Sequence, residues 1–266
     1  MASFLDAYVA PKKEIPRRAY LTVSTAVGAG ILMLWCVLSY GRLVRADFLP
    51  TPGEVVSAAI AGLGDGSLLV NTGVSVTEIM SGFVIASILS VPLGILMGSF
   101  KIVEAAIEPV TNFVRYLPVS ALIPLLILWV GIDMSEKITV IFIGTFFQQL
   151  ILIADVSRGV SQDLLDVSYT LGATRRTVVA RVLIPATMPG VMDTLRVTLG
   201  WAWTYLVVAE LVAANKGLGY FILNSMRGLF TDQIFLGIMV IGLLGLLTDQ
   251  VFKALRNWLL PWATAA

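Results

Sequence analysis

The chain has 266 residues, of which 58% are hydrophobic and only 13% are charged. So few charged residues cannot cover the surface of a soluble domain, so the bilayer is expected to be the main solvent. The formal net charge of +1 gives no basis for binding nucleic acid, and the absence of histidine together with a single cysteine, Cys36, excludes histidine-based catalytic triads, histidine or cysteine metal sites and an intrachain disulfide.

Six long apolar runs predict six membrane-spanning helices, because a helix needs about 20 apolar residues to cross a bilayer. The predicted spans are residues 19–41, 69–100, 116–132, 138–156, 188–214 and 233–252, with tails at 1–18 and 259–266. The basic N-terminal tail and the first apolar run resemble a signal peptide in order. The run is too long for one and no clear cleavage site follows it, so we predict an uncleaved first span. The expected fold is an all-α integral membrane protein.

Two short helices are predicted on the outer face of the membrane. Thr51 and Glu54 have the spacing of a capping box, and Pro52 fits the first helical position, where its missing N–H costs nothing. The segment from Asn215 to Asp232 has a glycine turn followed by an amphipathic pattern, which predicts the second short helix.

The third span, residues 116–132, contains Pro118 and Pro124, which predict a broken or steeply kinked helix. A bilayer tolerates such a break only where the freed backbone groups face protein or a water-filled path. Pro118 and Pro124 therefore belong either to a kinked packing helix or to a helix that lines a translocation pathway. Arg115, just before this span, is assigned to a cytoplasmic connection.

Other polar residues inside the spans need partners. Gln148 and Gln149 are expected to form hydrogen bonds between helices, with substrate contact as the alternative. Asp193 and Arg196 lie one turn apart and are expected to pair with each other at the cytoplasmic edge.

Glu210 is the one ionisable residue predicted well inside a span, which marks it as a candidate functional position. One hypothesis is that Glu210 lines or gates the outer half of a pathway together with Trp203, Thr204 and Tyr205. The competing hypothesis is that Glu210 pairs with Lys216 or Arg227 at the outer rim. The tryptophans near it are equally suited to ordinary packing.

The longest polar interruption in the C-terminal half runs from Ser161 to Pro189. Ser161 is expected to cap a short helix, and Gly172 to end it, because glycine accepts the left-handed conformation that a helix stop needs. Thr174 is a candidate N-cap for a second helix, which Pro185 or Pro189 would close. The pattern predicts two helices joined by a glycine elbow. Because most of the lysines and arginines fall on the same side of the six spans, this elbow and both termini are expected to be cytoplasmic.

The elbow also resembles a known family motif. Gly172 lies six positions after Asp166, and Val182-Leu183-Ile184-Pro185 follows at the distance seen in the EAA loop of permease subunits of bacterial ATP-binding-cassette (ABC) importers. The sequence departs from that pattern in having Asp166-Val167-Ser168 for Glu-Ala-Ala and Val182 for Ile. More specific segments are Leu117-Pro118-Val119 with Ile123-Pro124-Leu125-Leu126-Ile127-Leu128-Trp129, and Gly200-Trp201-Ala202-Trp203 with Ala209-Glu210-Leu211. Together they resemble the nitrate/sulfonate/bicarbonate branch, over roughly residues 48–258.

The resemblance implies a type I ABC importer transmembrane domain in a bacterial inner membrane, with a cytoplasmic coupling helix in the loop 161–185. The residues that it implies for docking on an ATPase are Leu164, Leu165, Asp166, Tyr169, Gly172, Ala173, Arg175, Arg176 and Pro185. It also implies two ATPase subunits, a second permease copy, membrane lipid, and a periplasmic or lipid-anchored binding protein that delivers nitrate, bicarbonate, cyanate or an organic sulfonate. If the loop were only a solvated connection, its arginines would serve only to set topology.

The chain has no GxxxxGK[ST] loop, so ATP and Mg²⁺ are expected on the partner ATPase, and no cofactor is expected on this chain. The alternative function is a self-sufficient secondary transporter. That class predicts inverted repeats and ion-coupling carboxylates in discontinuous helices, and no convincing repeat is visible. A membrane anchor without transport would leave Glu210 and the broken third span unexplained.

Overall fold

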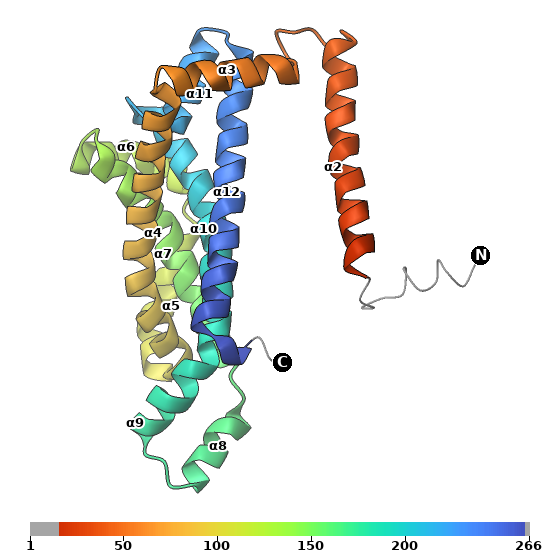
Figure 1. The fold of residues 1–266 in the computed structure, drawn as a ribbon. Coiled ribbons are helices and arrows are strands. Elements are labelled where there is room, and N and C mark those ends of the chain that lie inside the picture. The colour runs from red at the N-terminus through yellow and green to blue at the C-terminus, as the bar shows by residue number, and fades with distance from the viewer. Residues whose placement is uncertain (1–15, 264–266) are drawn as a thin grey trace.

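The computed structural model describes residues 16–263, which form a bundle of long helices without a strand in that part of the chain (Figure 1). The helices are α2 (Arg17–Tyr40), α3 (Pro52–Gly64), α4 (Ser67–Ser99), α5 (Lys101–Arg115), α6 (Val119–Val130), α7 (Met134–Arg158), α8 (Gln162–Thr170), α9 (Arg175–Val178), α10 (Ile184–Ala213), α11 (Leu218–Arg227) and α12 (Thr231–Leu259). Residues 1–15 of the predicted N-terminal tail and residues 264–266 of the predicted C-terminal tail lie outside the described residues.

By length and composition, five helical stretches could cross a membrane. These are α2, α4, α7, α12 and the continuous stretch from Arg175 to Val212 that contains α9 and most of α10. A sixth span exists only if α5 and α6, which are bent by 97° relative to each other, count as one broken span. The predicted all-α membrane fold is confirmed.

The core of the bundle is the packing of α4 against α7 and α10. Ile79 and Phe83 of α4 meet Ile141 of α7 and Leu206 of α10 in one buried cluster. Glycines allow α4 to approach α7 closely: a Cβ added at Gly98 would lie 2.3 Å from the carbonyl oxygen of Ala154. Small residues at such positions are how helices reach close contact where lipid gives no hydrophobic drive for association.

The third predicted span is broken, as its prolines predicted, but the break lies at the start of the predicted run, at Pro118, and Pro124 lies inside α6. Helix α5 ends at Arg115 and α6 begins at Val119, and α6 is only about 18 Å long, too short for a hydrocarbon core of about 30 Å. Pro118 provides the physical reason, since its ring biases the preceding residue away from helical conformation. Arg115, which we assigned to a cytoplasmic connection, is the last residue of α5, a helix that packs against α4 and α7.

The helix after the elbow also continues where we expected it to stop. It passes from α9 through a π-helical turn, Val179–Leu183, into α10, so Pro185 and Pro189 both lie within a helix rather than closing one. In the π-turn the N–H of Ile184 donates to the carbonyl of Val179, and Pro185 follows it in the first turn of α10. Pro185 is tolerated at this position because it follows the widened π-turn in the first turn of α10, where the helix needs no backbone N–H from it.

The two ends of the bundle carry different short helices. Figure 1 shows α3 and α11 at one end, called the α3 end, and α8 and α9 at the other, called the α8 end. The predicted capping box of α3 is present: Thr51 Oγ1 accepts from the N–H of Glu54 at 3.2 Å, and Glu54 Oε2 accepts from the N–H of Thr51 at 2.7 Å. Helix α2 stands beside the bundle, and Trp35 stacks on Phe235 of α12 with ring centroids 6.2 Å apart.

Candidate functional site

Helix α8 protrudes beyond the bundle and buries none of its residues (Figure 1). Leu164 and Val167 of α8 and Leu171, which caps its C-terminal end, recur at positions i, i+3 and i+7 and are 45%, 58% and 82% exposed. That spacing places them on one face of a helix. We call this face the α8 stripe. An apolar stripe on a protruding helix has the form of a contact surface for another protein.

The elbow after α8 has the geometry expected of Gly172. Its φ is +81°, and the helix ends with two backbone hydrogen bonds, from the N–H of Gly172 to Tyr169 O at 2.9 Å and from the N–H of Ala173 to Ser168 O at 3.1 Å. This pair of bonds is the Schellman motif. Nothing lies within 4 Å of a Cβ added at Gly172, so the backbone conformation alone requires glycine there.

The caps of the two elbow helices differ from each other. Thr174 caps α9, as predicted, by accepting from the N–H of Thr177 at 3.4 Å. Ser161 occupies the N-cap position of α8, but its hydroxyl makes no cap hydrogen bond, so that prediction is wrong. The first turn of α8 is joined to the second by Gln162, whose Nε2 donates to Asp166 Oδ1 at 2.9 Å.

The elbow is braced against the bundle. The guanidinium of Arg175 lies over the ring of Phe100, 4.9 Å from its centroid, at the junction of α4 and α5. Leu165 and Tyr169 of α8 line a small cavity, of about 160 Å³, together with Arg175 and the ends of α4 and α7. Arg176 is exposed, and Pro185 is half-buried at the start of α10. A force applied to α8 can therefore reach the bundle through both Arg175 and the helix that continues into α10.

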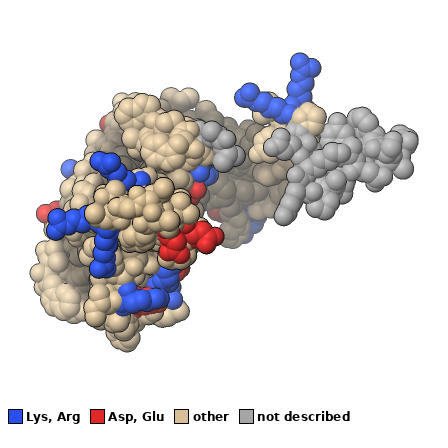
Figure 2. All heavy atoms as spheres, turned by 90° about the horizontal axis from the view of Figure 1, so that it is seen from below, with Lys and Arg blue, Asp and Glu red and all other residues tan. Residues whose placement is uncertain are grey.

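The α8 end is also rich in charge. Figure 2, which views the molecule from this end, shows Lys and Arg side chains spread over the surface beside a smaller group of acids. Arg158 at the end of α7 bonds Asp155 at 2.7 Å and reaches Glu108 at 3.2 Å and Glu104 at 3.5 Å. These pairs fix the ends of α5 and α7 to each other.

At the α3 end, the first turn of α11 is held by side chains of two long helices. The N–H groups of Gly217, Leu218 and Gly219 donate to Asn71 Oδ1, Ser75 Oγ and Glu210 Oε2, at 2.9, 2.8 and 2.5 Å. The Ser75 hydroxyl in turn donates to Glu210 Oε1 at 2.5 Å. A helix start has free N–H groups that need such acceptors. We call Asn71, Ser75 and Glu210 the clasp.

The clasp bears on the two hypotheses for Glu210. The Glu210 side chain is fully buried, and it is hydrogen-bonded to Ser75, to the backbone of α11 and to the neighbouring carboxyl group of Glu78. Neither Lys216 nor Arg227 pairs with Glu210, and both are exposed, so the hypothesis of a rim ion pair with one of these two residues is wrong. That Glu210 lines or gates a pathway stays a prediction. A Cβ added at Gly217 would lie 2.2 Å from Glu210 Oε1, which shows how closely the loop folds over this carboxyl group.

Further buried polar groups beside the clasp were not foreseen. Glu78, Glu136 and Lys137 are all buried, with Lys137 Nζ 3.4 Å from Glu136 Oε2 and 3.2 Å from the carbonyl of Asp133. The sequence carried one signal for this region: Asn71, Ser75 and Glu78 recur at i, i+4 and i+7, which puts a polar stripe on one face of α4.

The other pathway candidates are distributed rather than gathered. Trp203 is buried in the core cluster with Ile79 and Phe83, so its role is packing, whereas Thr204 and Pro124 are exposed. Pro118 and Tyr205 do meet, as two lining residues of a cavity of about 280 Å³ beneath the α5–α6 break.

Polar residues in the spans find different partners from those expected. Gln149 bonds Ser90 and Ser87 of α4 and Thr198 of α10, which are bonds between helices, whereas Gln148 lines the cavity beneath the α5–α6 break. Arg196 bonds Asp249 of α12. Asp193 instead lies 3.4 Å from Arg256 of α12. The expected pairing of Asp193 with Arg196 is therefore wrong, because α12 offers each a partner across the helix interface.

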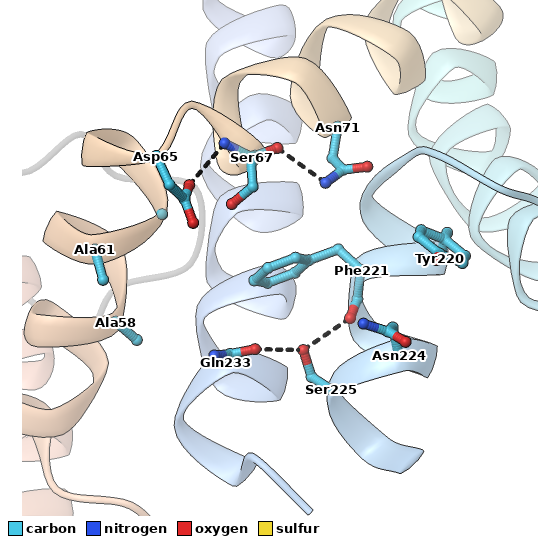
Figure 3. Close-up of a pocket in the computed structure, with 11 residues that line it drawn as sticks. Ala58, Ala61, Asp65, Ser67, Asn71, Tyr220, Phe221, Asn224, Ser225 and Gln233 are labelled. Carbon is cyan, nitrogen blue, oxygen red and sulfur yellow. Dashed lines mark hydrogen bonds between the residues drawn. The ribbon is translucent and has the colours of Figure 1, made fainter. Parts of the chain in front are cut away.

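A polar cavity of about 310 Å³ opens at the α3 end, between α3, α4, α11 and α12 (Figure 3). Asp65 accepts from the N–H of Ser67 at 2.8 Å, and Ser225 donates to Gln233 at 2.9 Å. Hydrogen bonds from Ser67 hold the pKa of the Asp65 carboxyl group below its usual value. Among residues 16–263, no group of three or more potential metal ligands is found.

Comparisons with known proteins identify the family to which this architecture belongs. A family model described as binding-protein-dependent transport system inner membrane component matches residues 90–262. The chain is 36% identical to a probable ABC transporter permease protein of Brucella abortus, over 92% of this chain and 95% of that one. It is 31% identical to the taurine transport system permease protein of Escherichia coli, over 93% of this chain and 92% of that one.

A putative aliphatic sulfonates transport permease protein of Bacillus subtilis is 33% identical, over 88% of this chain and 85% of that one. Among solved structures, a chain of the MetNI methionine ABC transporter in an inward-facing conformation has a similar fold, with a TM-score of 0.57 and 18% identity over 68% of this chain and 92% of that one.

Proposed function

From the premise that this chain belongs to the family of binding-protein-dependent transport system inner membrane components and is a permease subunit of an ABC importer, we propose a docking site. The ATPase subunit docks on the α8 stripe. The exposed stripe of Leu164, Val167 and Leu171 is the observation that carries this proposal. The chain has no phosphate-binding loop, so ATP and Mg²⁺ are held by the partner.

The mechanism is mechanical linkage. When two ATPase subunits close around ATP, the clefts that hold two α8 helices approach each other. Each α8 helix then moves the bundle through Arg175 and the helix that continues into α10. One chain presents one α8, so two permease chains are needed, and a two-fold symmetric pair is the simplest arrangement.

The proposed orientation puts the α8 end, the start of α2 and the end of α12 in the cytoplasm (Figure 1). The exposed arginines of the α8 end support this orientation, because basic residues concentrate on the cytoplasmic side. The α3 end then faces the substrate-binding protein, and the cavity bounded by Asp65, Asn71 and Gln233 opens on that face.

The proposed substrate is a small organic sulfonate or a similar oxyanion. Two relatives that match along most of their length carry the names of taurine and of aliphatic sulfonates. A second candidate is a neutral heterocycle, since a formylaminopyrimidine transport permease protein of Halalkalibacterium halodurans is 29% identical over 92% of this chain and 98% of that one.

Cysteine cross-linking tests the docking proposal, because Cys36 is the only native cysteine. In a Cys36→Ser background, Val167→Cys is expected to form a specific cross-link to the ATPase subunit in assembled complexes. A cysteine at Val27, which is equally exposed on α2, is the matched control and is expected to form none. If Val167→Cys stays uncross-linked in a complex that hydrolyses ATP, the docking proposal fails.

A further inference from the structure

The cavity beneath the α5–α6 break has one cationic lining residue, Arg115. The cavity is about 280 Å³ in volume, and Arg115, Tyr116, Gly144, Gln148 and Tyr205 are among its lining residues. This volume lies just below the roughly 300–1,000 Å³ of typical small-molecule sites, so it suits a ligand of few heavy atoms.

Arg115 is half-buried at the end of α5, away from the α8 end of the bundle. The ion pairs of Arg158 with Glu104 and Glu108 mark the α8 end. Arg115 lies two turns of α5, or about 10 Å, beyond Glu108, and Gln148 lies about 15 Å along α7 from Arg158. In a hydrocarbon core of about 30 Å, Arg115 lies about a third of the way in and Gln148 about half of the way in.

The guanidinium of Arg115 has no carboxylate partner within residues 16–263. Its Nη2 donates to the hydroxyl of Tyr116 at 3.0 Å and its Cζ lies 4.8 Å from the centre of that ring, while its Nε is buried without any hydrogen-bond partner. Arg158, Arg196 and Arg256, in α7, α10 and α12, differ from Arg115 because each reaches a carboxylate.

An arginine at membrane depth is costly unless something compensates its charge. A guanidinium carries five N–H donors in a planar fork that matches the oxygens of a carboxylate, phosphate or sulfonate. At Arg115 most of that fork is unused. Because the fold supplies no anion there, the geometry is that of a site completed by an anion from outside the chain.

The opposite wall of the cavity is shaped by a glycine. A Cβ added at Gly144 would lie 2.6 Å from the ring of Tyr205, so the absence of a side chain on α7 lets that ring lie flat against the helix. Tyr205 and Tyr116 then give the cavity aromatic surfaces, and Gln148 adds an amide.

We propose that Arg115, with Tyr116 and Gln148, forms an anion-binding station of the translocation pathway, which holds the oxyanion head of the substrate within the membrane at the α5–α6 break. This proposal rests on the proposed function of the chain as an importer of small sulfonates. Arg115 is then the residue that makes the pathway itself selective for negative charge.

The test uses the complete complex of permease, ATPase and binding protein, reconstituted in vesicles of phosphatidylcholine alone, so that no anionic lipid can occupy the site. The probe is ethanesulfonate. We expect Arg115→Gln to lower ATP-driven uptake at least tenfold and Arg115→Lys, which keeps the charge but loses the fork, to lower it less. Basal ATP hydrolysis and assembly are expected to stay within twofold of wild type. Arg45→Gln, at an exposed arginine between α2 and α3, is the control and is expected to leave uptake unchanged.

Three outcomes would overturn the proposal. If Arg115→Gln takes up ethanesulfonate at the wild-type rate, the anion station is refuted while the importer function stands. If Arg115→Gln lowers basal ATP hydrolysis as much as it lowers uptake, Arg115 is a structural residue. If the wild-type complex takes up no sulfonate at all, the proposed substrate class fails, and the station fails with it.

Discussion

Replacing the α8 stripe by alanine is the perturbation whose effect can be worked out most directly. Burying a whole leucine or valine side chain stabilises by about 1.5–3 kcal/mol. Leu164, Val167 and Leu171 are 45%, 58% and 82% exposed, so covering all three in an ATPase cleft stabilises the complex by about 3–5 kcal/mol. Alanine keeps the Cβ, so the triple alanine variant is expected to lose about 2–4 kcal/mol of that.

Because 1.4 kcal/mol is a factor of ten, ATPase affinity should fall on the order of 100-fold. The assay is equilibrium binding of the ATPase subunit to the permease in nanodiscs. The matched control is triple alanine substitution of Val27, Ile31 and Leu34, which form a similarly exposed stripe on α2. This variant should bind as wild type does. If the α8 variant is folded and binds within twofold of wild type, the assignment of the stripe is refuted.

Three further changes have expected outcomes. Gly172→Val places a β-branched side chain at φ +81°, which costs roughly 1–2 kcal/mol, so ATPase co-purification should fall about tenfold while membrane insertion is normal. Ser75→Ala removes the acceptor of the buried Leu218 N–H, so the folding free energy should fall by about 1–3 kcal/mol and the thermal midpoint by several degrees. Ser57→Ala, at an exposed position of α3, should leave the midpoint unchanged. Gly98→Ala should cost about 1–3 kcal/mol of folding free energy through overpacking and so lower the thermal midpoint. Gly73→Ala on the same helix meets no atom within 4 Å and should leave the midpoint unchanged.

The features that could be predicted from the sequence are those that depend on neighbouring residues. Thr51 and Glu54 form their capping box and Gly172 adopts its left-handed conformation, because each needs only atoms a few residues away. The apolar runs are equally local signals, so the all-α membrane class followed from composition alone. The α8 stripe was also present in the sequence as apolar residues at helical spacing.

The features that could not be predicted depend on contacts between distant segments. One hypothesis for Glu210 was a basic partner nearby in the sequence, but Ser75 reaches it from α4, 135 positions away. Arg196 likewise takes its carboxylate from α12 rather than from Asp193. The angle between α5 and α6 could not be predicted either. Pro118 marks where the chain bends, but the packing of α5 against α7 determines the angle of the bend.

The central claim is that this permease moves substrate only when force reaches α8 from a separate ATPase. The most direct test compares concentrative uptake of ethanesulfonate into vesicles that contain the complete complex with uptake into vesicles that contain this chain alone. We predict accumulation against a gradient that requires both ATP and the ATPase subunit, and none with the chain by itself under any ion gradient. Uphill uptake by the isolated chain would contradict the account.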